Sequence, residues 1–402
     1  MKKIFFKVPA LAFMVLLAAC GLLGPAPENP PSDGQDTPPP EDTQPPPVSK
    51  AQERLNGMTL EEKVGQLFIV RPESLLTPDA NRAGVTALDA HMAAYPVGGI
   101  ALFGQNIVTP EQLTSFIDEV QRQSETPLFI AVDEEGGAVA RIANSKNFSV
   151  PERYRSMQEI GATGEPAEAK KVGATIGAYL KQYGFNLDFA PVADVFTNPN
   201  NTVIGNRSFG SDPDLVSGMV AAEISGLHEA GVMSCAKHYP GHGDTKGDTH
   251  EGFVSIEKTW DELTRCELIP FMKAIEAQTD MVMVSHIVAT NITGDSLPSS
   301  LSYEMVEEKL RGELGYTGVV ITDAMEMGAI SQEYSSSESA VKAILAGVDV
   351  ILMPENFAEA YEGVLRAVKD GTISEKRIDE SVLRILELKD KYGLLEKATG
   401  EE

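Results

Sequence analysis

The chain has 402 residues, 42% of them hydrophobic, which is enough to bury a sizeable core within one large domain. Its formal net charge of −26 argues against nucleic acid as a partner, because a phosphate-binding protein needs a basic face. The charge leaves neutral sugars open as ligands, and most of the carboxylates are interpreted as a solvated acidic surface.

The first twenty residues differ in composition from everything that follows them. A basic start, MKKIFFK, precedes the apolar stretch VPALAFMVLLAA and then Cys20. This pattern predicts a secretory signal peptide over residues 1–20, which is too short and wrongly flanked for a stable membrane span. The sequence LAAC followed by Gly21 resembles the lipobox of bacterial lipoproteins. That resemblance implies cleavage before Cys20 and lipidation of Cys20, with a plain signal peptide as the alternative. In both cases we expect export, and with the lipobox an anchor in the cell envelope.

Residues 21–50 contain ten of the 25 prolines, together with five acidic residues and one lysine. Such a composition cannot bury a core and predicts an extended, disordered spacer that would hold a folded domain away from a membrane surface. Beyond Cys20 only Cys235 and Cys266 remain, and two cysteines make no disulfide framework. Both are interpreted as buried free thiols.

From about residue 53 onward, short apolar runs alternate with helical stretches. The runs are continuous rather than alternating, as expected of parallel strands that are buried on both faces. The predicted strands are 66–70, 97–103, 127–133, 186–195, 232–239, 281–288, 318–324 and 348–354. Between them, Thr109 with Pro110 and Gln112 predicts a helix start with a capping box, and the last helix is predicted to start near Ser374 and stop at Gly393.

Eight strands alternating with helices predict an α/β fold in the form of a single (β/α)8 TIM barrel over residues 53–398. The competing arrangement is a doubly wound open sheet. No G-x-G-x-x-G follows the first strand, which weakens that alternative without excluding it.

Several polar residues end these apolar runs, and in a barrel of this kind the chemistry lies at the carboxyl ends of the strands. Asp133 ends the third run, Lys237 and His238 end the fifth, His286 closes the sixth and Asp323 closes the seventh. Any one of them could merely cap the next helix. Because they would all point to one rim, a shared site is the better interpretation.

The run Lys237–Gly252 contains three of the six histidines, and three interpretations compete for it. His238 and His242 have the i, i+4 spacing of a zinc site on a helix, but Pro240 and Gly241 lie between them and make a helix improbable. A metal site built from the loop itself stays open. The interpretation as a phosphate-binding loop is weak, because the lysine precedes the glycines and no helix is predicted to follow them.

The third interpretation is a mobile loop that carries a catalytic acid. Asp248 and His250 are two residues apart, so in an extended loop their side chains point the same way. A carboxylate beside an imidazole favours the protonated form and fixes the tautomer. The pair is therefore suited to donating a proton near neutral pH. Glycines at 241, 243 and 247 are expected to let the loop close over a substrate.

Four motifs together resemble glycoside hydrolase family 3, in its β-N-acetylhexosaminidase branch. They are AVDEEGGAVARI, IGNRSFG, KHYPGHGDTKGDTH and VVITDAMEM, and the resemblance covers about residues 53–395. The lysine–histidine run followed by D-x-H is the most specific of these signals. The stretch EEGGAVAR departs from the commoner QEGGRVQR around Arg141.

The resemblance implies a (β/α)8 barrel and a retaining double displacement without a cofactor or metal. Asp323 matches the nucleophile, and His250 matches an acid/base with Asp248 as its partner, where most retaining glycosidases use two carboxylates. The residues that match sugar contacts are Asp133, Arg141, Arg207, Lys237 and His238, with His286 as a further contact that shapes the site. His242 is expected to be structural.

The leading hypothesis from the sequence is an exo-acting β-N-acetylglucosaminidase that removes terminal N-acetylglucosamine from peptidoglycan- or chitin-derived oligosaccharides. It is expected to be a monomer that binds no nucleic acid and reaches the membrane only through its lipid anchor. Two alternatives stay open. One is a phosphorylase, because a histidine acid/base places no negative charge beside incoming phosphate. The other is a lipoprotein that binds glycans without turning them over.

Overall fold

The computed structural model describes residues 48–75, 95–250 and 252–396. The predicted signal peptide, the lipidation site Cys20 and the predicted spacer up to residue 47 lie outside the described residues. Each of the eight apolar runs predicted as a strand contains one, and all eight are buried. They are β1 (Phe68–Val70), β2 (Gly99–Ala101), β3 (Phe129–Val132), β6 (Leu187–Asp188), β7 (Cys235–Tyr239), β9 (Met281–Val284), β11 (Val319–Thr322) and β12 (Ile351–Leu352).

The strands are shorter than the sequence predicts. The run predicted over 186–195 is the clearest case, because β6 ends at Asp188 and Pro191 follows three residues later. A proline has no N–H with which to continue a strand ladder. In the rest of the predicted run, the only described strand-like pairing is an isolated parallel bridge between Val192 and Lys237.

All neighbouring pairs among these eight strands run parallel. They form a sheet in the order β12-β1-β2-β3-β6 and a second sheet in the order β11-β9-β7. Two isolated parallel bridges lie between the sheets, one from Leu187 of β6 to Met233 and one from Ile321 of β11 to Val350. The chain therefore has the mixed α/β fold that the sequence predicts, with the carboxyl ends of neighbouring strands on one side.

The structure contains two further small pairs of strands, and of their members only Ile287–Val288 lies within a predicted run, 281–288. The segments β4 (Glu134–Gly136) and β5 (Val139–Ala140) form an antiparallel hairpin directly after β3. The segments β8 (Val254–Ser255) and β10 (Ile287–Val288) pair in parallel. The hairpin turns at Gly137, whose φ of +64° lies in the left-handed region that glycine tolerates. It places Glu135 and Arg141 near the end of β3.

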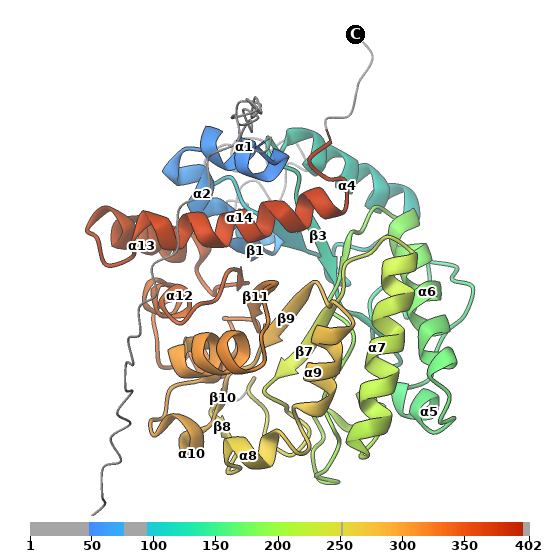
Figure 1. The fold of residues 1–402 in the computed structure, drawn as a ribbon. Helices are drawn as coiled ribbons and strands as arrows, with labels where there is room; N and C mark the ends of the chain where they lie inside the picture. The colour runs from blue at the N-terminus through green and yellow to red at the C-terminus, as the bar shows by residue number, and fades with distance from the viewer. Residues whose placement is uncertain (1–47, 76–94, 251, 397–402) are drawn as a thin grey trace, which may run out of the picture. The chain divides into compact units, whose positions relative to one another are not determined.

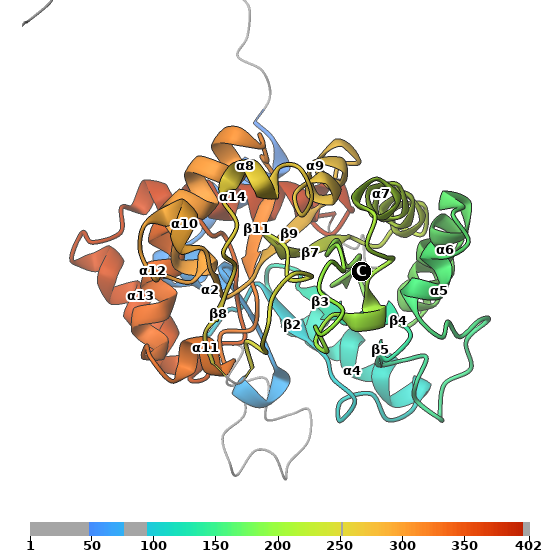
Figure 2. The ribbon, with the colours of Figure 1, turned by 90° about the horizontal axis from the view of Figure 1, so that it is seen from below.

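Helices lie around the group of parallel strands (Figures 1 and 2). The α-helices are α1 (Lys50–Gly57), α2 (Leu60–Gln66), α4 (Pro110–Gln123), α5 (Met157–Gly161), α6 (Pro166–Gln182), α7 (Pro213–Glu229), α8 (Trp260–Leu263), α9 (Ile269–Glu276), α10 (Thr290–Thr293), α11 (Gly328–Ser331), α12 (Ser336–Leu345), α13 (Phe357–Lys369) and α14 (Glu375–Lys391). Shorter or wider turns are η1 (Pro72–Leu75), η4 (Gly205–Arg207), η5 (Ser299–Leu301) and the π-helix η6 (Glu304–Glu313).

Of the two helix starts predicted from the sequence, one is confirmed in full and the other only in part. The side chain of Ser374 caps α14 by accepting from the backbone N–H of Arg377, as expected. Thr109 caps α4 in the same way, but the predicted capping box is wrong. The Oε1 of Gln112 accepts from Val108 N–H at 3.1 Å, one residue before the cap. The side chain thus satisfies a donor outside the helix rather than that of the cap residue.

The cysteine prediction is confirmed for Cys235, which is a fully buried free thiol on β7. Cys266 is also free but only half-buried, because it lies between the short helices α8 and α9 rather than inside a long one. Burial nevertheless raises the pKa of its thiol to about 11, so it is a poor nucleophile at neutral pH. Within the described residues, no helix is long and apolar enough to cross a membrane.

Candidate active site

A cavity of about 620 Å³ opens at the carboxyl ends of the parallel strands. Residues far apart in the sequence meet there because they follow, or lie in, strands of the same direction. Of the residues singled out from the sequence, its wall includes Asp133, Arg141, Arg207, Lys237, His238, His242, His250 and Asp323.

An ion network fills one wall of the cavity. The Nζ of Lys237, on β7, lies 2.7 Å from Oδ1 of Asp133 and 2.7 Å from Oε1 of Glu135. Arg207 reaches the same Glu135 through Nε at 2.8 Å and a terminal nitrogen at 2.7 Å. This two-pronged contact fixes the guanidinium in one orientation. Arg141 completes the network from the β5 side, 3.4 Å from Oδ2 of Asp133.

The network holds its members in their charged forms. Burial acts to lower the pKa of Lys237, but the carboxylates of Asp133 and Glu135 outweigh it and hold that pKa above its ordinary value. Burial acts to raise the pKa of Glu135, but Lys237 and Arg207 outweigh it and hold that pKa below its ordinary value. The wall is therefore a set of fixed charges whose hydrogen-bonding groups are oriented in advance.

His238 is oriented by a carboxylate that the sequence did not single out. Its Nδ1 lies 2.7 Å from Oδ2 of Asp194, which is fully buried, and its Nε2 lies 3.3 Å from a terminal nitrogen of Arg207. Because a guanidinium has no acceptor, Nε2 must accept and Nδ1 must carry the hydrogen that it donates to Asp194. Asp194 also accepts from His242 N–H at 2.5 Å, so one carboxylate fixes both histidine positions.

His242 is buried in the cavity wall. Its Nδ1 lies 2.6 Å from the hydroxyl of Thr245, while its Nε2 is buried without a hydrogen-bond partner among the described residues. Burial lowers the pKa of His242, so the ring is neutral near pH 7. Its burial and its bond to Thr245 fit the structural role expected from the sequence.

The glycines of this loop lie where backbone packing and conformation require them, and the closure of the loop over a substrate stays a prediction. A Cβ at Gly243 would lie 1.9 Å from the carbonyl oxygen of Val195, so this glycine allows a close approach between two backbones. Gly241 and Gly247 adopt φ values of +124° and +152°, which other residues rarely adopt. These glycines serve to pack and turn the chain at defined positions.

Asp248 and His250 form the predicted pair. The Nδ1 of His250 lies 2.6 Å from Oδ1 of Asp248, which also accepts from His250 N–H at 2.9 Å. Burial acts to raise the pKa of Asp248, but these two bonds outweigh it and hold that pKa below its ordinary value. The His250 side chain is 67% exposed, so its Nε2 side is accessible from the cavity.

The segment carrying the pair is attached to the turn after β11. Gly328 N–H donates to the His250 carbonyl at 3.2 Å, and Ala329 N–H donates to the Thr249 carbonyl at 3.0 Å. Asp323 lies at the start of the same turn, with its N–H bonded to Val284 of β9 at 2.8 Å. These backbone bonds bring Asp323 and His250 to one cavity.

Asp323 is held as a carboxylate. Burial acts to raise its pKa, but His238, His286 and the N–H of Ala324, 2.8 Å from Oδ1, outweigh it and hold that pKa below the ordinary value. A deprotonated carboxylate that lines a cavity is suited to nucleophilic attack.

The structure does not bring His286 to the cavity. It is fully buried behind Asp323, with Nδ1 2.8 Å from the hydroxyl of Ser300 and Nε2 3.0 Å from the carbonyl oxygen of Ala324. Since a carbonyl only accepts, Nε2 carries the hydrogen. His286 therefore supports the turn that bears Asp323 and has no free ring nitrogen for a sugar.

The cavity wall also contains residues that sequence reasoning missed. Glu135 lay inside a quoted motif, but nothing in one sequence distinguished it from Glu134, which instead accepts three backbone N–H groups between Arg141 and Ala143. Asp194 ended the fourth predicted strand, so the rule that picked out Asp133 and Asp323 could have found it. Arg71 and Phe103 also line the cavity and belong to no quoted motif, while Glu326 lines it from within the motif VVITDAMEM, where it was assigned no role.

A comparison with known protein families identifies the family of the chain. A family model described as the glycosyl hydrolase family 3 N terminal domain matches residues 59–388. The chain belongs to glycoside hydrolase family 3.

Known members of family 3 resemble the chain over most of its length. It is 34% identical to the beta-hexosaminidase A of Pseudoalteromonas piscicida, over 77% of this chain and 56% of the relative. It is 33% identical to the beta-hexosaminidase LpqI of Mycobacterium tuberculosis, over 73% of this chain and 76% of the relative. A solved family 3 beta-N-acetylglucosaminidase from Paenibacillus sp. str. FPU-7 matches with a TM-score of 0.78 and 37% identity, over 86% of this chain and 65% of that one. The chain thus spans just over half the length of the first of these relatives.

The donors in this family 3 cavity do not form a metal site. Among the described residues, no group of three or more histidine, cysteine, aspartate or glutamate side chains is arranged to hold a metal ion. The spacing of His238 and His242 suggested zinc, but their ring centroids lie 6.1 Å apart. One ring nitrogen of His238 is bonded to Asp194, and one ring nitrogen of His242 is bonded to Thr245.

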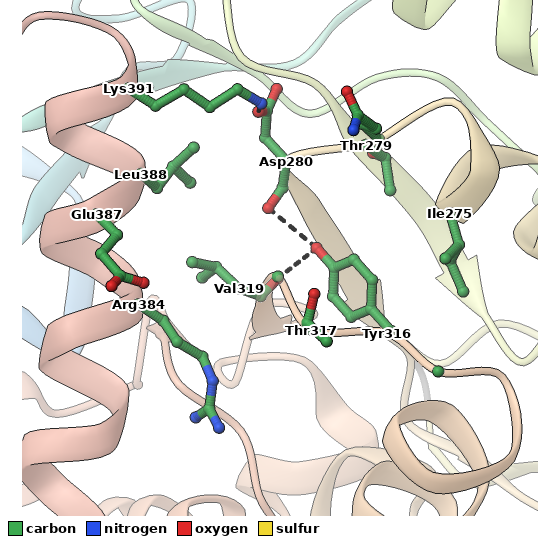
Figure 3. Close-up of a pocket in the computed structure, with 13 residues that line it drawn as sticks. Ile275, Thr279, Asp280, Tyr316, Thr317, Val319, Arg384, Glu387, Leu388 and Lys391 are labelled. Atoms are coloured by element: carbon green, nitrogen blue, oxygen red, sulfur yellow. Dashed lines mark hydrogen bonds and ion pairs between the residues drawn. The ribbon is translucent and has the colours of Figure 1, made fainter. Parts of the chain in front are cut away.

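A second pocket of about 580 Å³ lies at the amino ends of β9 and β11, against α14 (Figure 3). Three of the four charged side chains that line it, Asp280, Arg384 and Lys391, already have ion-pair partners among the described residues. Asp280 pairs with Lys391 at 2.6 Å and with His228 at 2.8 Å. The hydroxyl of Tyr316 lies 2.9 Å from the Asp280 carbonyl oxygen and 3.1 Å from that of Val319 (Figure 3). The catalytic candidates all lie at the other strand ends, so the 620 Å³ cavity is the candidate active site.

Proposed function

We propose that this chain is a retaining exo-β-N-acetylglucosaminidase that removes terminal N-acetylglucosamine from peptidoglycan- or chitin-derived oligosaccharides. The names of its relatives support the activity. The observation that carries the proposal is that Asp323 and His250 line one cavity, beside a wall of buried ion pairs. An ionised carboxylate and an imidazole with a carboxylate partner are the two groups that a double displacement needs.

In the first step, Asp323 attacks the anomeric carbon and forms a covalent bond to it. The bond between that carbon and the leaving oxygen breaks, and His250 gives its proton to the oxygen. In the second step, His250 takes a proton from water, the water oxygen bonds to the anomeric carbon, and the Asp323 carboxylate is released. Asp248 holds the Nδ1 side of His250, which leaves Nε2 to move the proton and stabilises the imidazolium when it forms.

The opposite wall holds the sugar in the terminal position. Asp133 and Arg141 bind its hydroxyls, and Lys237, Arg207 and His238 supply further contacts to the hydroxyls and the N-acetyl group. The ion pairs among these residues favour this role, because their orientations are fixed before substrate arrives. His286 does not contact the sugar in this proposal. It supports the turn that carries Asp323 through its hydrogen bond to the Ala324 carbonyl oxygen.

The eight parallel strands form one closed (β/α)8 barrel in this proposal. The order β12-β1-β2-β3-β6 and the order β7-β9-β11 follow the sequence, and the parallel bridges at Leu187 and Ile321 lie where the two sheets would join. The domain boundaries proposed from the sequence are a signal peptide over 1–20, a spacer over 21–50 and a catalytic domain over 53–398. The protein is then a monomer anchored through Cys20 to the cell envelope, on the outer face of a membrane or in the periplasm.

Hydrolysis is favoured over phosphorolysis by the charges of the cavity. Each cation that lines it has a carboxylate partner among the described residues: Arg71 with Glu326, Arg141 and Lys237 with Asp133, and Arg207 with Glu135. A phosphate would have to displace one of these partners.

The experiment is product analysis on chitobiose and on an aryl β-N-acetylglucosaminide, with and without phosphate. The proposal expects free N-acetylglucosamine at a rate that phosphate does not change, and loss of turnover in Asp323→Asn. N-acetylglucosamine 1-phosphate as the main product would make the protein a phosphorylase. Binding without turnover by the wild type would make it a glycan-binding protein.

A further inference from the structure

An ion pair to which the proposed mechanism assigns no role forms part of the cavity wall. Arg71 follows β1 and Glu326 follows β11, and the two side chains are in ion-pair contact. The Arg71 guanidinium also lies over the ring of Phe103, 4.6 Å from its centroid, while the Nε of Arg71 is buried without a hydrogen-bond partner among the described residues. Both side chains are about one-third exposed, so they face the cavity.

Backbone hydrogen bonds connect the segment that carries Glu326 with the segment that carries the candidate acid, His250. The acid must reach the glycosidic oxygen, so the leaving sugar lies next to His250. The His250 carbonyl accepts from Gly328 N–H at 3.2 Å, two residues beyond Glu326. Glu326 N–H in turn donates to the carbonyl of Met353 at 3.0 Å, which brings the turn after β12 to the same wall.

The charges of this wall differ from those of the sugar-binding wall. Arg71 already has Glu326 as its partner. Glu355, in the turn after β12, lines the cavity, is exposed and has no hydrogen bond or ion pair with any described residue. The wall residues Arg71, Glu326 and Glu355, which follow β1, β11 and β12, thus carry two carboxylates against one guanidinium.

We propose that Arg71, Glu326 and Glu355 select an uncharged leaving sugar, so that chitin-type N-acetylglucosamine oligosaccharides are preferred over glycans whose leaving sugar carries a carboxylate. The inference rests on the proposed glycosidase function. Hydroxyl groups of a neutral sugar donate to the two glutamates and accept from Arg71. A substrate carboxylate finds no unpaired cation there and is repelled by both glutamates.

The experiment compares three disaccharides with N-acetylglucosamine at the non-reducing end. The leaving sugar is N-acetylglucosamine, N-acetylmuramic acid with its free carboxylate, or the methyl amide of that acid. The amide keeps the lactyl bulk and removes the charge. We expect the wild-type kcat/KM for the carboxylate to be about tenfold below that for the amide, as for one unpaired charge near two like charges. The difference should shrink in high salt.

Two variants locate the cause. Glu326→Gln leaves Arg71 free to bind a carboxylate. Glu355→Gln removes a charge that has no partner in the described structure. Each variant should reduce the ratio of kcat/KM for the amide substrate to kcat/KM for the carboxylate substrate by about threefold or more. Glu362→Gln is the matched control, because Glu362 is exposed on α13, outside the cavity wall, and gives the same change in net charge. The thermal midpoint of each variant checks that it is folded.

Equal kcat/KM values for the carboxylate and amide substrates in the wild type would overturn the inference and leave the glycosidase function standing. A penalty that both cavity variants leave unchanged would do the same. Absence of turnover of every disaccharide and of the aryl β-N-acetylglucosaminide would instead overturn the proposed function.

Discussion

His250 Nδ1 lies 2.6 Å from Asp248 Oδ1, and the same oxygen accepts from the His250 backbone N–H at 2.9 Å. Two bonds to one oxygen fix both the tautomer of the ring and its direction. The exposed Nε2 side of the ring is left to move a proton in the cavity that Asp323 lines. In the proposed mechanism this pair takes the place of the second carboxylate of most retaining glycosidases.

Asp248→Asn should reduce kcat/KM for substrates with poor leaving groups by about 10²-fold, because the imidazole loses the charge that stabilises its protonated form. The basic limb of the pH–rate profile should move to lower pH for the same reason. Steady-state rates on chitobiose and on a dinitrophenyl glycoside measure both effects, and the dinitrophenyl substrate should be less affected. Asp118→Asn, exposed on α4, is the charge-matched control. An unchanged pH profile would contradict the role given to Asp248.

The pKa of Asp323, held below its ordinary value, sets the expected acid limb of the same profile. A carboxyl group whose pKa is lowered stays ionised, and therefore nucleophilic, as the pH falls through the usual range. The midpoint of the loss of kcat/KM from protonation of Asp323 should therefore lie below pH 3.8, the ordinary value. Short assays with a pH-jump control for unfolding measure it. A limb above that pH in a folded enzyme would mean that another group controls it.

Asp194→Asn tests the positioning of His238. In Asp194 one carboxylate oxygen accepts from the His238 ring and the other accepts from the His242 N–H. The asparagine amide has only one oxygen, so the His238 tautomer that accepts from Arg207 loses its support. We expect KM to rise by about tenfold or more with a smaller change in kcat, because the proposed role of His238 is to contact the sugar and not the departing oxygen. A fall in kcat with KM unchanged would place Asp194 in the chemical step instead.

Glu135→Gln tests the ion network. The folded-state pKa of Glu135 is lowered, so its contribution to stability is present above its ordinary pKa of 4.5 and is lost as the pH falls through the folded value. At pH 7 the variant should lose about 3 kcal/mol, because it leaves buried cations with one partner fewer. The difference from wild type should shrink below pH 4.5. Denaturant unfolding at both pH values measures it, and a difference independent of pH would refute the ionic account.

Gly243→Ala should destabilise the protein by about 1–3 kcal/mol, because its Cβ would lie 1.9 Å from the Val195 carbonyl oxygen. The displaced loop carries His242, so activity should fall as well. Gly252→Ala is the matched control, since a Cβ there would meet nothing within 4 Å. Equal thermal midpoints for the two variants would mean that Gly243 serves loop mobility rather than packing.

The sequence predicted those features that depend on local pattern. All eight buried strands were found because continuous apolar runs mark them, and Asp133, Lys237 and Asp323 were found because they end such runs. The Asp248–His250 contact followed from their spacing. The ion pairs Glu135–Arg207 and Arg71–Glu326 could not be predicted in this way, since each joins segments whose distance in space depends on the whole fold. The burial of His286 behind Asp323 has the same origin, because it depends on Ser300 and Ala324.

The most direct test of the account is to trap the covalent intermediate. In His250→Ala, a dinitrophenyl β-N-acetylglucosaminide needs no acid for the first step, while the second step lacks its base, so the glycosyl-enzyme should accumulate. Mass spectrometry should then find one N-acetylglucosamine residue on the peptide that contains Asp323, and none in His250→Ala combined with Asp323→Asn. A sugar on a different residue, or turnover by the Asp323→Asn variant at the wild-type rate, would contradict the assignment of Asp323 as the nucleophile.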